Sequence, residues 1–170
     1  ELLGNYFSTK LGLDVRGVRL PGIIIWKVEP TAGTTDYAVE IFYKAIQEKH
    51  YICPLGPDTR LPMMYIPDAI SALMNLSVAD SSKLKHHADF NVNAMSFTPH
   101  ELAMAIRKRL PDFRIEYDVD PLRQGIADSW PDRLDDTIAR KEWGWLPKYG
   151  IGELVDDMIE NLSIKLGSSD

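Results

Sequence analysis

Short apolar segments of strand length alternate with amphipathic helical segments along this chain, and this alternation constrains its fold most strongly. Residues 14–26 carry a near-continuous apolar run of the kind found in parallel strands covered on both faces. Helical spacing follows at 36–49, and strand-like runs return at 51–53 and 63–66. The pattern predicts an α/β fold with a parallel sheet.

Proline, glycine and capping residues divide these segments further. Pro21 and Gly22 interrupt the first run, so we expect its strand to end near Leu20 and a loop to begin there. Thr98, followed by Pro99 and Glu101, forms a capping box that predicts a helix start. We also expect a helix with Asp68 as its N-cap and with Ala69, Ala72, Leu73 and Leu76 on its buried face. Further elements are expected at 2–11, 90–94, 114–119, 134–142 and 153–166.

Composition excludes several classes of function. The 19 lysines and arginines are outnumbered by 25 aspartates and glutamates, so no basic excess is present to neutralise nucleic-acid phosphates or anionic lipid. No apolar run approaches the roughly 20 residues of a membrane helix. The single cysteine, Cys53, cannot form an internal disulfide, which favours a reducing compartment. We therefore expect a soluble intracellular protein without nucleic-acid or membrane partners.

The sequence lacks the familiar phosphate-binding and metal-binding motifs. It has neither a Gly-x-Gly-x-x-Gly nor a Walker loop, and Cys53 has no histidine or cysteine at metal-ligand spacing. His86 and His87 are adjacent, so they would not share a helix face. We expect no metal site.

Three segments are candidates for ligand binding, each with a structural alternative. Arg19, Leu20, Pro21 and Gly22 lie at the C-terminal end of a buried strand, where α/β proteins bind ligands, although Pro and Gly are also ordinary in loops. Gly33, Thr34, Thr35 and Asp36 open a helix, where free N–H groups and hydroxyls can hold a small polar ligand or simply cap the helix. Trp130 lies in a loop and is open to binding, whereas Trp143 and Trp145 are more typical of core anchors.

These segments together resemble the C-terminal half of the extended short-chain dehydrogenase/reductases. A strand ending in Arg-x-Pro-Gly and a terminal Trp-Gly-Trp-x-Pro before the last helix are typical of that family, and both occur here, at 19–22 and 143–147. Within the family, the chain is similar to the NAD-dependent L-threonine 3-dehydrogenases of the short-chain type. Four stretches carry this similarity, at 33–38, 61–70, 93–99 and 126–131.

The resemblance implies a fold, a reaction and a cofactor. Residues 1–170 would be the C-terminal part of a Rossmann-type domain with its small substrate-binding subdomain, and the Gly-rich NAD-binding part would precede them. The chain begins at Glu1 directly inside a helical stripe, so we expect it to come from a longer parent. The parent would oxidise L-threonine to 2-amino-3-oxobutyrate with NAD⁺ in threonine catabolism. The catalytic Tyr-x-x-x-Lys would lie upstream of Glu1, and residues 1–170 alone would be inactive.

The resemblance also assigns roles to the candidate residues. The backbone of Leu20, Pro21, Gly22 and Ile23 would contact the nicotinamide. Gly33, Thr34 and Thr35 would hold the amino-acid head of threonine, with Asp36 a further candidate, and Trp130 would close over the methyl side. Tyr6 and Lys10 reproduce the spacing of the catalytic pair but match the continuation of its helix. Family members often form homodimers through this helix, and are mitochondrial in eukaryotes and cytoplasmic in bacteria.

Two other functions remain open. A nucleotide-sugar epimerase or dehydratase usually has an Arg-Asp pair where this chain has Met63 and Met64, and thioethers cannot make the charge-assisted contacts that a diphosphate needs. The chain could also be a non-catalytic piece that supplies packing and dimer contacts.

Overall fold

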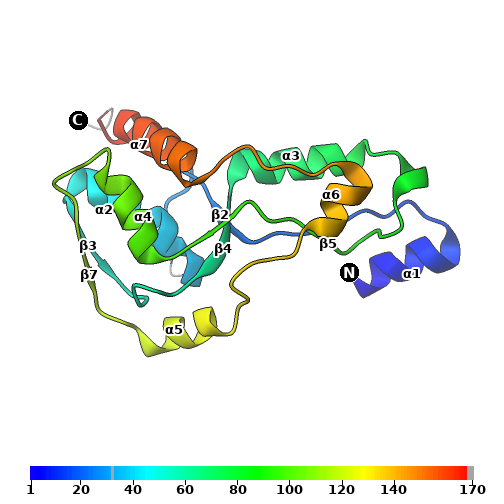
Figure 1. Cartoon of the computed structure of the whole chain (residues 1–170), viewed down its shortest axis with the longest axis horizontal. Helices are drawn as coiled ribbons and strands as arrows, with labels where there is room; N and C mark the ends of the chain where they lie inside the picture. The colour runs from blue at the N-terminus through cyan, green and yellow to red at the C-terminus, as the bar shows by residue number, and fades with distance from the viewer. Residues whose placement is uncertain (32, 168–170) are drawn as a thin grey trace.

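The computed structural model describes residues 1–31 and 33–167 of the chain (Figure 1). Its helices are α1 (Leu2–Leu11), α2 (Tyr37–Gln47), α3 (Ile66–Ser77), α4 (Pro99–Arg107), α5 (Pro121–Asp128), α6 (Thr137–Trp143) and α7 (Ile151–Gly167), with 3-10 turns η1 (Thr34–Asp36) and η2 (Ser81–Lys83). Its strands are β1 (Val18–Arg19), β2 (Gly22–Ile24), β3 (His50–Cys53), β4 (Leu61–Tyr65), β5 (Phe90–Asn91), β6 (Met95–Phe97) and β7 (Arg114–Tyr117).

The strands form three small, mostly parallel ladders. β1 pairs with β5, β2 pairs with β4, and β3 pairs with β7, all in parallel, while β6 adds to β4 in antiparallel orientation. Parallel partners need a crossover connection, and helices supply most of the crossovers here. The α/β class expected from the alternation is therefore confirmed.

The prediction that the first strand ends near Leu20 is confirmed, since β1 ends at Arg19, but the prediction that a loop begins there was wrong. Gly22 instead begins β2, which pairs with β4 through Met63, Met64 and Tyr65. Pro21 has no N–H to donate, so the ladder with β5 cannot continue through it. The chain therefore leaves β5 after Arg19 and joins β4 within three residues.

Helix α4 begins as the sequence predicts, but α3 does not. Thr98 Oγ1 accepts the N–H of Glu101 at 3.2 Å, and the Glu101 carboxylate accepts the N–H of Thr98 at 3.0 Å. In α3 the N-cap position belongs to Tyr65, and Asp68 lies in the first turn. The Asp68 carboxylate is buried, and it accepts the backbone N–H groups of Lys148 and Tyr149 at 2.9 and 3.0 Å.

The buried face of α3 is narrower than expected. Ala69, Ala72 and Leu76 are buried, whereas Leu73 is half-exposed, on the side of the helix where Ile70 is also exposed. The prediction that Leu73 is buried was therefore wrong. Helix α3 packs on the second core through Ala69, Ala72 and Leu76, so the side that carries Ile70 and Leu73 faces away from that core.

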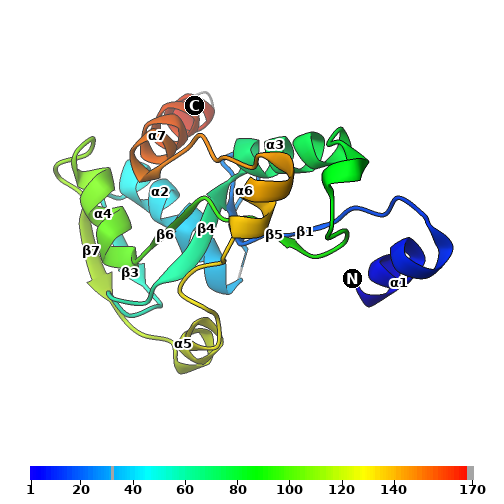
Figure 2. The same ribbon diagram turned by 45° about the vertical axis from the view of Figure 1, so that its right-hand side comes forward.

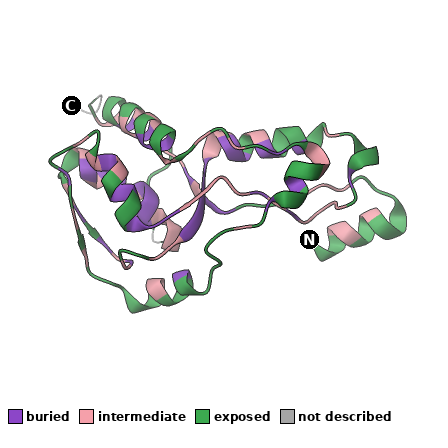
Figure 3. Ribbon diagram, in the orientation of Figure 1, coloured by how far each residue is buried: buried purple, intermediate pink, exposed green. Residues whose placement is uncertain are grey.

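Strand β4 connects two hydrophobic cores. Met63 points into the core built around α2, α4 and α7, and Met64 points into a second core of α3, β5 and α6 that includes Trp145. Successive side chains of a strand point to opposite faces, so consecutive methionines reach different cores. Figure 2 shows β4 running between the two groups of helices. None of the described residues of α1 is buried, and its ribbon in Figure 3 is mostly exposed.

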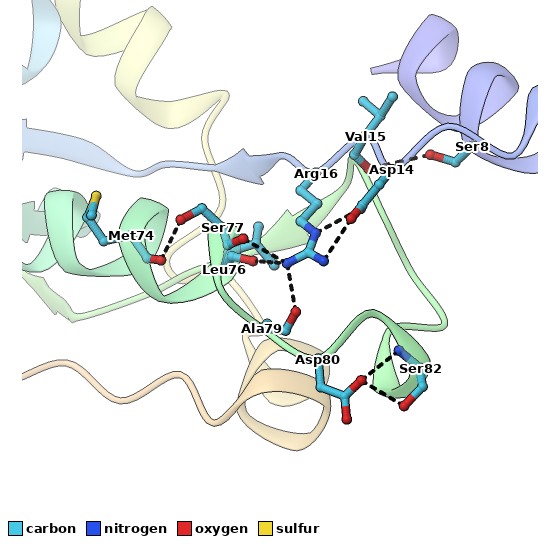
Figure 4. Close-up of polar contacts among 10 residues, drawn as sticks. All are labelled: Ser8, Asp14, Val15, Arg16, Met74, Leu76, Ser77, Ala79, Asp80 and Ser82. Carbon is cyan, nitrogen blue, oxygen red and sulfur yellow. Dashed lines mark hydrogen bonds and ion pairs between the residues drawn. The ribbon is translucent and has the colours of Figure 1, made fainter.

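Arg16 joins the connection between α1 and β1 to the C-terminal end of α3 (Figure 4). Its Nη1 donates to the carbonyl oxygens of Leu76, Ser77 and Ala79 at 2.6, 3.1 and 2.8 Å. The last carbonyls of a helix have no partner within the helix, and a guanidinium satisfies them and suits the negative end of the helix dipole. Asp14 holds the other side of the guanidinium, at 2.8 and 2.9 Å.

Candidate functional site

Two of the segments singled out in the sequence touch each other. A β-carbon placed on Gly22, at the start of β2, would stand 2.9 Å from Cγ2 of Thr35, in η1, and 2.6 Å from Sδ of Met63. At such distances the side chain of Met63 or Thr35 would have to shift to admit a larger residue, so glycine allows the closest approach here. The tertiary structure thereby brings the 20–23 segment and the 33–36 segment to one place.

Asp36 holds the loop that carries the threonines. Its Oδ2 accepts the backbone N–H groups of Thr31 and Gly33 at 2.7 and 3.3 Å, and also the Thr31 hydroxyl. The Asp36 carboxylate is thus engaged within its own loop. The hydroxyls of Thr34 and Thr35, both half-buried, make no hydrogen bond to the described part of the chain. They are the polar groups of this loop that remain available to a ligand.

Helix α5, which the sequence analysis did not anticipate, packs against η1. Gln124 anchors it: its Oε1 accepts the N–H of Gly56 at 2.9 Å, and its Nε2 donates to Thr59 Oγ1 at 3.0 Å. Asp120 caps the helix and Pro121 occupies the first turn, a signature that could have revealed it. Trp130 lies just after α5. Its backbone N–H donates to the Ala127 carbonyl at 3.0 Å, and its side chain is partly exposed.

The residues expected at the cofactor lie where β1 gives way to β2. Pro21 and Gly22 are buried, Ile23 is half-buried, and Leu20 is exposed. Leu20 belongs to neither ladder, so its backbone groups are not used in strand pairing. The break in the strand therefore presents an apolar side chain together with unpaired backbone groups.

Met63 and Met64, which the sequence analysis contrasted with the Arg-Asp pair expected of an epimerase, form an apolar position. Met63 and Met64 are fully buried. Arg60 donates to the Ser96 carbonyl at 2.8 Å and to Glu101 Oε1 at 2.6 Å, so its charge is already paired. The hydrogen bond from Arg60 to Glu101, together with the one from the Thr98 N–H, holds the pKa of Glu101 below its usual value.

Other chemically notable residues lie away from this site. Burial raises the pKa of the Cys53 thiol to about 11, which keeps it protonated and unreactive. Tyr6 and Lys10 stand on the exposed helix α1. Across 1–31 and 33–167 there is no helix with the length and hydropathy of a bilayer span, and no cluster of three potential metal ligands.

Comparison with solved structures identifies the fold. The L-threonine dehydrogenase from Clostridium difficile is 49% identical, with a TM-score of 0.95, over 96% of this chain and 51% of that one. The enzyme of the same name from Phytophthora infestans is 45% identical, with a TM-score of 0.94, over 97% of this chain and 53% of its own. The chain belongs to the extended short-chain dehydrogenase/reductase family.

Two further relatives match nearly the whole chain. The GalE-like L-threonine dehydrogenase from Cupriavidus necator is 48% identical, with a TM-score of 0.90, over 94% of this chain and 57% of that one. An uncharacterised epimerase/dehydratase of Staphylococcus aureus is 48% identical over 97% of this chain and 51% of its own length. The chain thus spans about half the length of the relatives it matches. No family model matches it.

A more distant relative shows the fold alone. The nucleoside-diphosphate-sugar epimerase from Agrobacterium tumefaciens is 22% identical, with a TM-score of 0.80. The two chains therefore share the arrangement of strands and helices at low sequence identity.

Proposed function

We propose that this chain is the substrate-binding half of an NAD-dependent L-threonine 3-dehydrogenase. Residues 1–170 would form the C-terminal part of one extended short-chain dehydrogenase domain, completed by a Gly-rich NAD-binding part in the parent protein. Relatives described as L-threonine dehydrogenases match nearly the whole chain at 45–49% identity, which supports the proposal. The curated relative at 48% identity is described as an uncharacterised epimerase/dehydratase, so an epimerase or dehydratase reaction is the alternative that the experiment below must exclude.

The contact between Gly22 and Thr35 is the observation that carries the proposal. It joins the segment assigned to the nicotinamide to the segment assigned to threonine, as a hydride transfer between the two requires. Gly33, Thr34 and Thr35 would hold the amino-acid head through backbone groups and the two available hydroxyls. Asp36 would keep this loop in shape through Thr31 and Gly33.

The break between β1 and β2 fits a nicotinamide ring. Leu20 offers an apolar surface for a flat ring, and the unpaired backbone groups beside Pro21 can pair with a carboxamide. The space in front of the Gly22 α-carbon is filled by Met63 and Thr35, so this glycine serves packing rather than approach of the cofactor. NAD⁺, when bound, would accept the hydride of the substrate.

The remaining residues of the site would orient the substrate and exclude water. Trp130, on the segment after α5, would close over the methyl side of threonine, and Gln124 would hold α5 in place for it. Exclusion of water protects a hydride transfer from competing reactions. The proton of the substrate hydroxyl would pass to a tyrosine upstream of Glu1.

Helix α1 is the proposed dimer contact of the parent. Leu2, Leu3 and Tyr6 are more than half exposed, and Leu11 and Leu13 extend this apolar surface. A homodimer that pairs through α1 would cover it.

Substrate oxidation by the full-length parent tests the proposed function. L-Threonine with NAD⁺ should yield NADH, whereas UDP-glucose and UDP-galactose should be neither oxidised nor epimerised. Residues 1–170 expressed alone should give no NADH. Turnover of a UDP-sugar without turnover of threonine would favour the epimerase alternative, and a parent without Tyr-x-x-x-Lys directly upstream of Glu1 would contradict the dehydrogenase.

A further inference from the structure

A hollow of about 550 Å³ lies at the carboxyl ends of the parallel strands β2 and β4. Ile25 and Trp26 follow β2, and Ile66 and Pro67 follow β4, so both rims are built from the residues that leave the sheet at that edge. Ligands of α/β proteins characteristically bind at this edge of a parallel sheet. The Gly22–Thr35 contact lies at the opposite, amino end of β2, so the hollow shares no residue with the proposed threonine site.

A carboxylate lines this hollow and is held in place. The hydroxyl of Tyr65 donates to Oδ2 of Asp157, on α7. Burial, and then the bond to this carboxylate, raise the pKa of Tyr65 well above its usual value, so the phenol stays a donor. The other oxygen, Asp157 Oδ1, has no hydrogen-bond partner within the described residues. The hollow therefore contains a positioned negative charge with a free acceptor.

Aromatic rings form the walls around this carboxylate. Tyr149 packs edge-on against Tyr65, with centroids 5.1 Å apart and planes at 71°. The indole of Trp26 already faces a cation, because Nζ of Lys27 stands 5.3 Å from its centroid. An aromatic face attracts an ammonium through its quadrupole, and more strongly when water is excluded.

The wall that carries Trp26 is fixed before any ligand arrives. The Trp26 carbonyl accepts the hydroxyl of Tyr43, on α2, at 3.2 Å. The Lys27 carbonyl accepts Nζ of Lys165, on α7, at 3.4 Å. Hydrogen bonds from two helices thus restrain this loop, and a restrained site loses less ordering entropy on binding.

We propose that this hollow is a second binding site, for a small organic ammonium with a flat apolar body. The ammonium would pair with Asp157 Oδ1, and the apolar body would lie between Trp26 and Tyr149, over Pro67 and Ile70. Lys27 lines the same hollow and its ammonium stands over the Trp26 ring, so Asp157 Oδ1 is the charged acceptor that a ligand ammonium would meet. The site is independent of the proposed dehydrogenase, because it needs neither NAD nor the threonine loop.

Calorimetric titration of the full-length natural protein with phenethylamine tests this site at pH 7.5. Phenethylamine should bind, and 3-phenylpropionate, which has a similar body and the opposite charge, should not. Asp157→Asn should weaken phenethylamine binding at least tenfold. The matched control is Asp156→Asn, at the neighbouring position of α7. The Asp156 carboxylate pairs with Arg109 at 2.8 Å instead of lining the hollow. The affinity of this variant for phenethylamine should stay within twofold of that of the unsubstituted protein.

Two further variants separate binding from folding. Tyr65→Phe removes the bond to Asp157 but keeps the charge, so phenethylamine binding should persist. Trp26→Leu should weaken phenethylamine binding several-fold, while its melting temperature should stay within a few degrees of that of the unsubstituted protein. Absence of phenethylamine binding, equal binding of 3-phenylpropionate, or equal losses in Asp157→Asn and Asp156→Asn would each overturn the proposal.

Discussion

Gly22 and Thr35 are in contact across the junction of β2 and η1, and a β-carbon on Gly22 would require the side chains of Thr35 and Met63 to move. This contact joins two segments that would otherwise be independent: the strand break at Leu20 and the loop closed by Asp36. The packing of one small residue thereby sets the separation between the proposed cofactor and substrate groups.

Replacement of Gly22 by alanine should cost stability. The new methyl would meet Met63 Sδ at 2.6 Å and Thr35 Cγ2 at 2.9 Å, and overpacking of this kind typically costs about 1–3 kcal/mol. Chemical denaturation of both variants measures the change. Gly125→Ala, in α5, is the control, because a β-carbon there meets nothing within 4 Å, and it should be neutral or stabilising by up to ~1 kcal/mol. Equal effects at the two glycines would contradict this account of Gly22.

Thr35 should affect threonine binding more than NAD binding in the parent protein. Thr35→Val keeps the methyl group that packs on Gly22 and loses the hydroxyl, so KM for threonine should rise about tenfold or more. Thr35→Ser keeps the hydroxyl and should raise KM for threonine less. Thr35→Ala should weaken the binding of threonine more than the binding of NAD. Steady-state kinetics with each substrate varied in turn give the comparison. A parallel loss of affinity for threonine and NAD would count against the assignment.

Arg16→Ala should loosen the C-terminal end of α3. The guanidinium satisfies the carbonyls of Leu76, Ser77 and Ala79, and its loss should lower the free energy of unfolding by about 2–3 kcal/mol. The control is Arg109→Ala, whose exposed pair with Asp156 should contribute less than ~0.5 kcal/mol. If both arginines prove equally dispensable, Arg16 does not cap α3.

Thr98→Ala should destabilise α4 by about 1 kcal/mol, because the N–H of Glu101 loses its acceptor. Thr98→Ser preserves the hydroxyl and should restore most of the difference. Thermal unfolding of the three proteins measures the cap; a serine variant no better than alanine would show that the lost methyl, not the hydrogen bond, matters.

Glu142 should make stability depend on pH in the acid range. Burial alone would raise the pKa of Glu142, but hydrogen bonds from His86 and from the Lys85 N–H outweigh it and hold that pKa below its usual value. Its contribution is therefore present above the ordinary carboxyl pKa and is lost as the pH falls through the lowered one. The melting temperatures of the parent and Glu142→Gln should differ most near neutral pH and converge in acid.

The exposed Glu160 supplies the comparison for Glu142. The melting temperature of Glu160→Gln should equal that of the unsubstituted protein at each pH. A difference between the parent and Glu142→Gln that stays constant from neutral pH to acid would show that Glu142 does not titrate with folding.

Local signals in the sequence determined several elements of the fold. The Thr98–Glu101 capping box and the end of α1 at Gly12, with φ of 67°, depend on residues within one helical turn, so a sequence pattern is sufficient to find them. The alternation of strands and helices determined the α/β class in the same way. The three candidate segments were also visible as patterns, because proline, glycine and threonine have distinctive local chemistry.

Only the tertiary structure decided which distant groups meet. Asp68 has the pattern of an N-cap, but its partners lie 80 and 81 residues further along the chain, and they bury it. Arg16 finds its carbonyl partners 60 to 63 residues away. The contact of Gly22 with Thr35 and the hollow beside Asp157 have the same origin. Each depends on packing between segments far apart in sequence, which no local preference encodes.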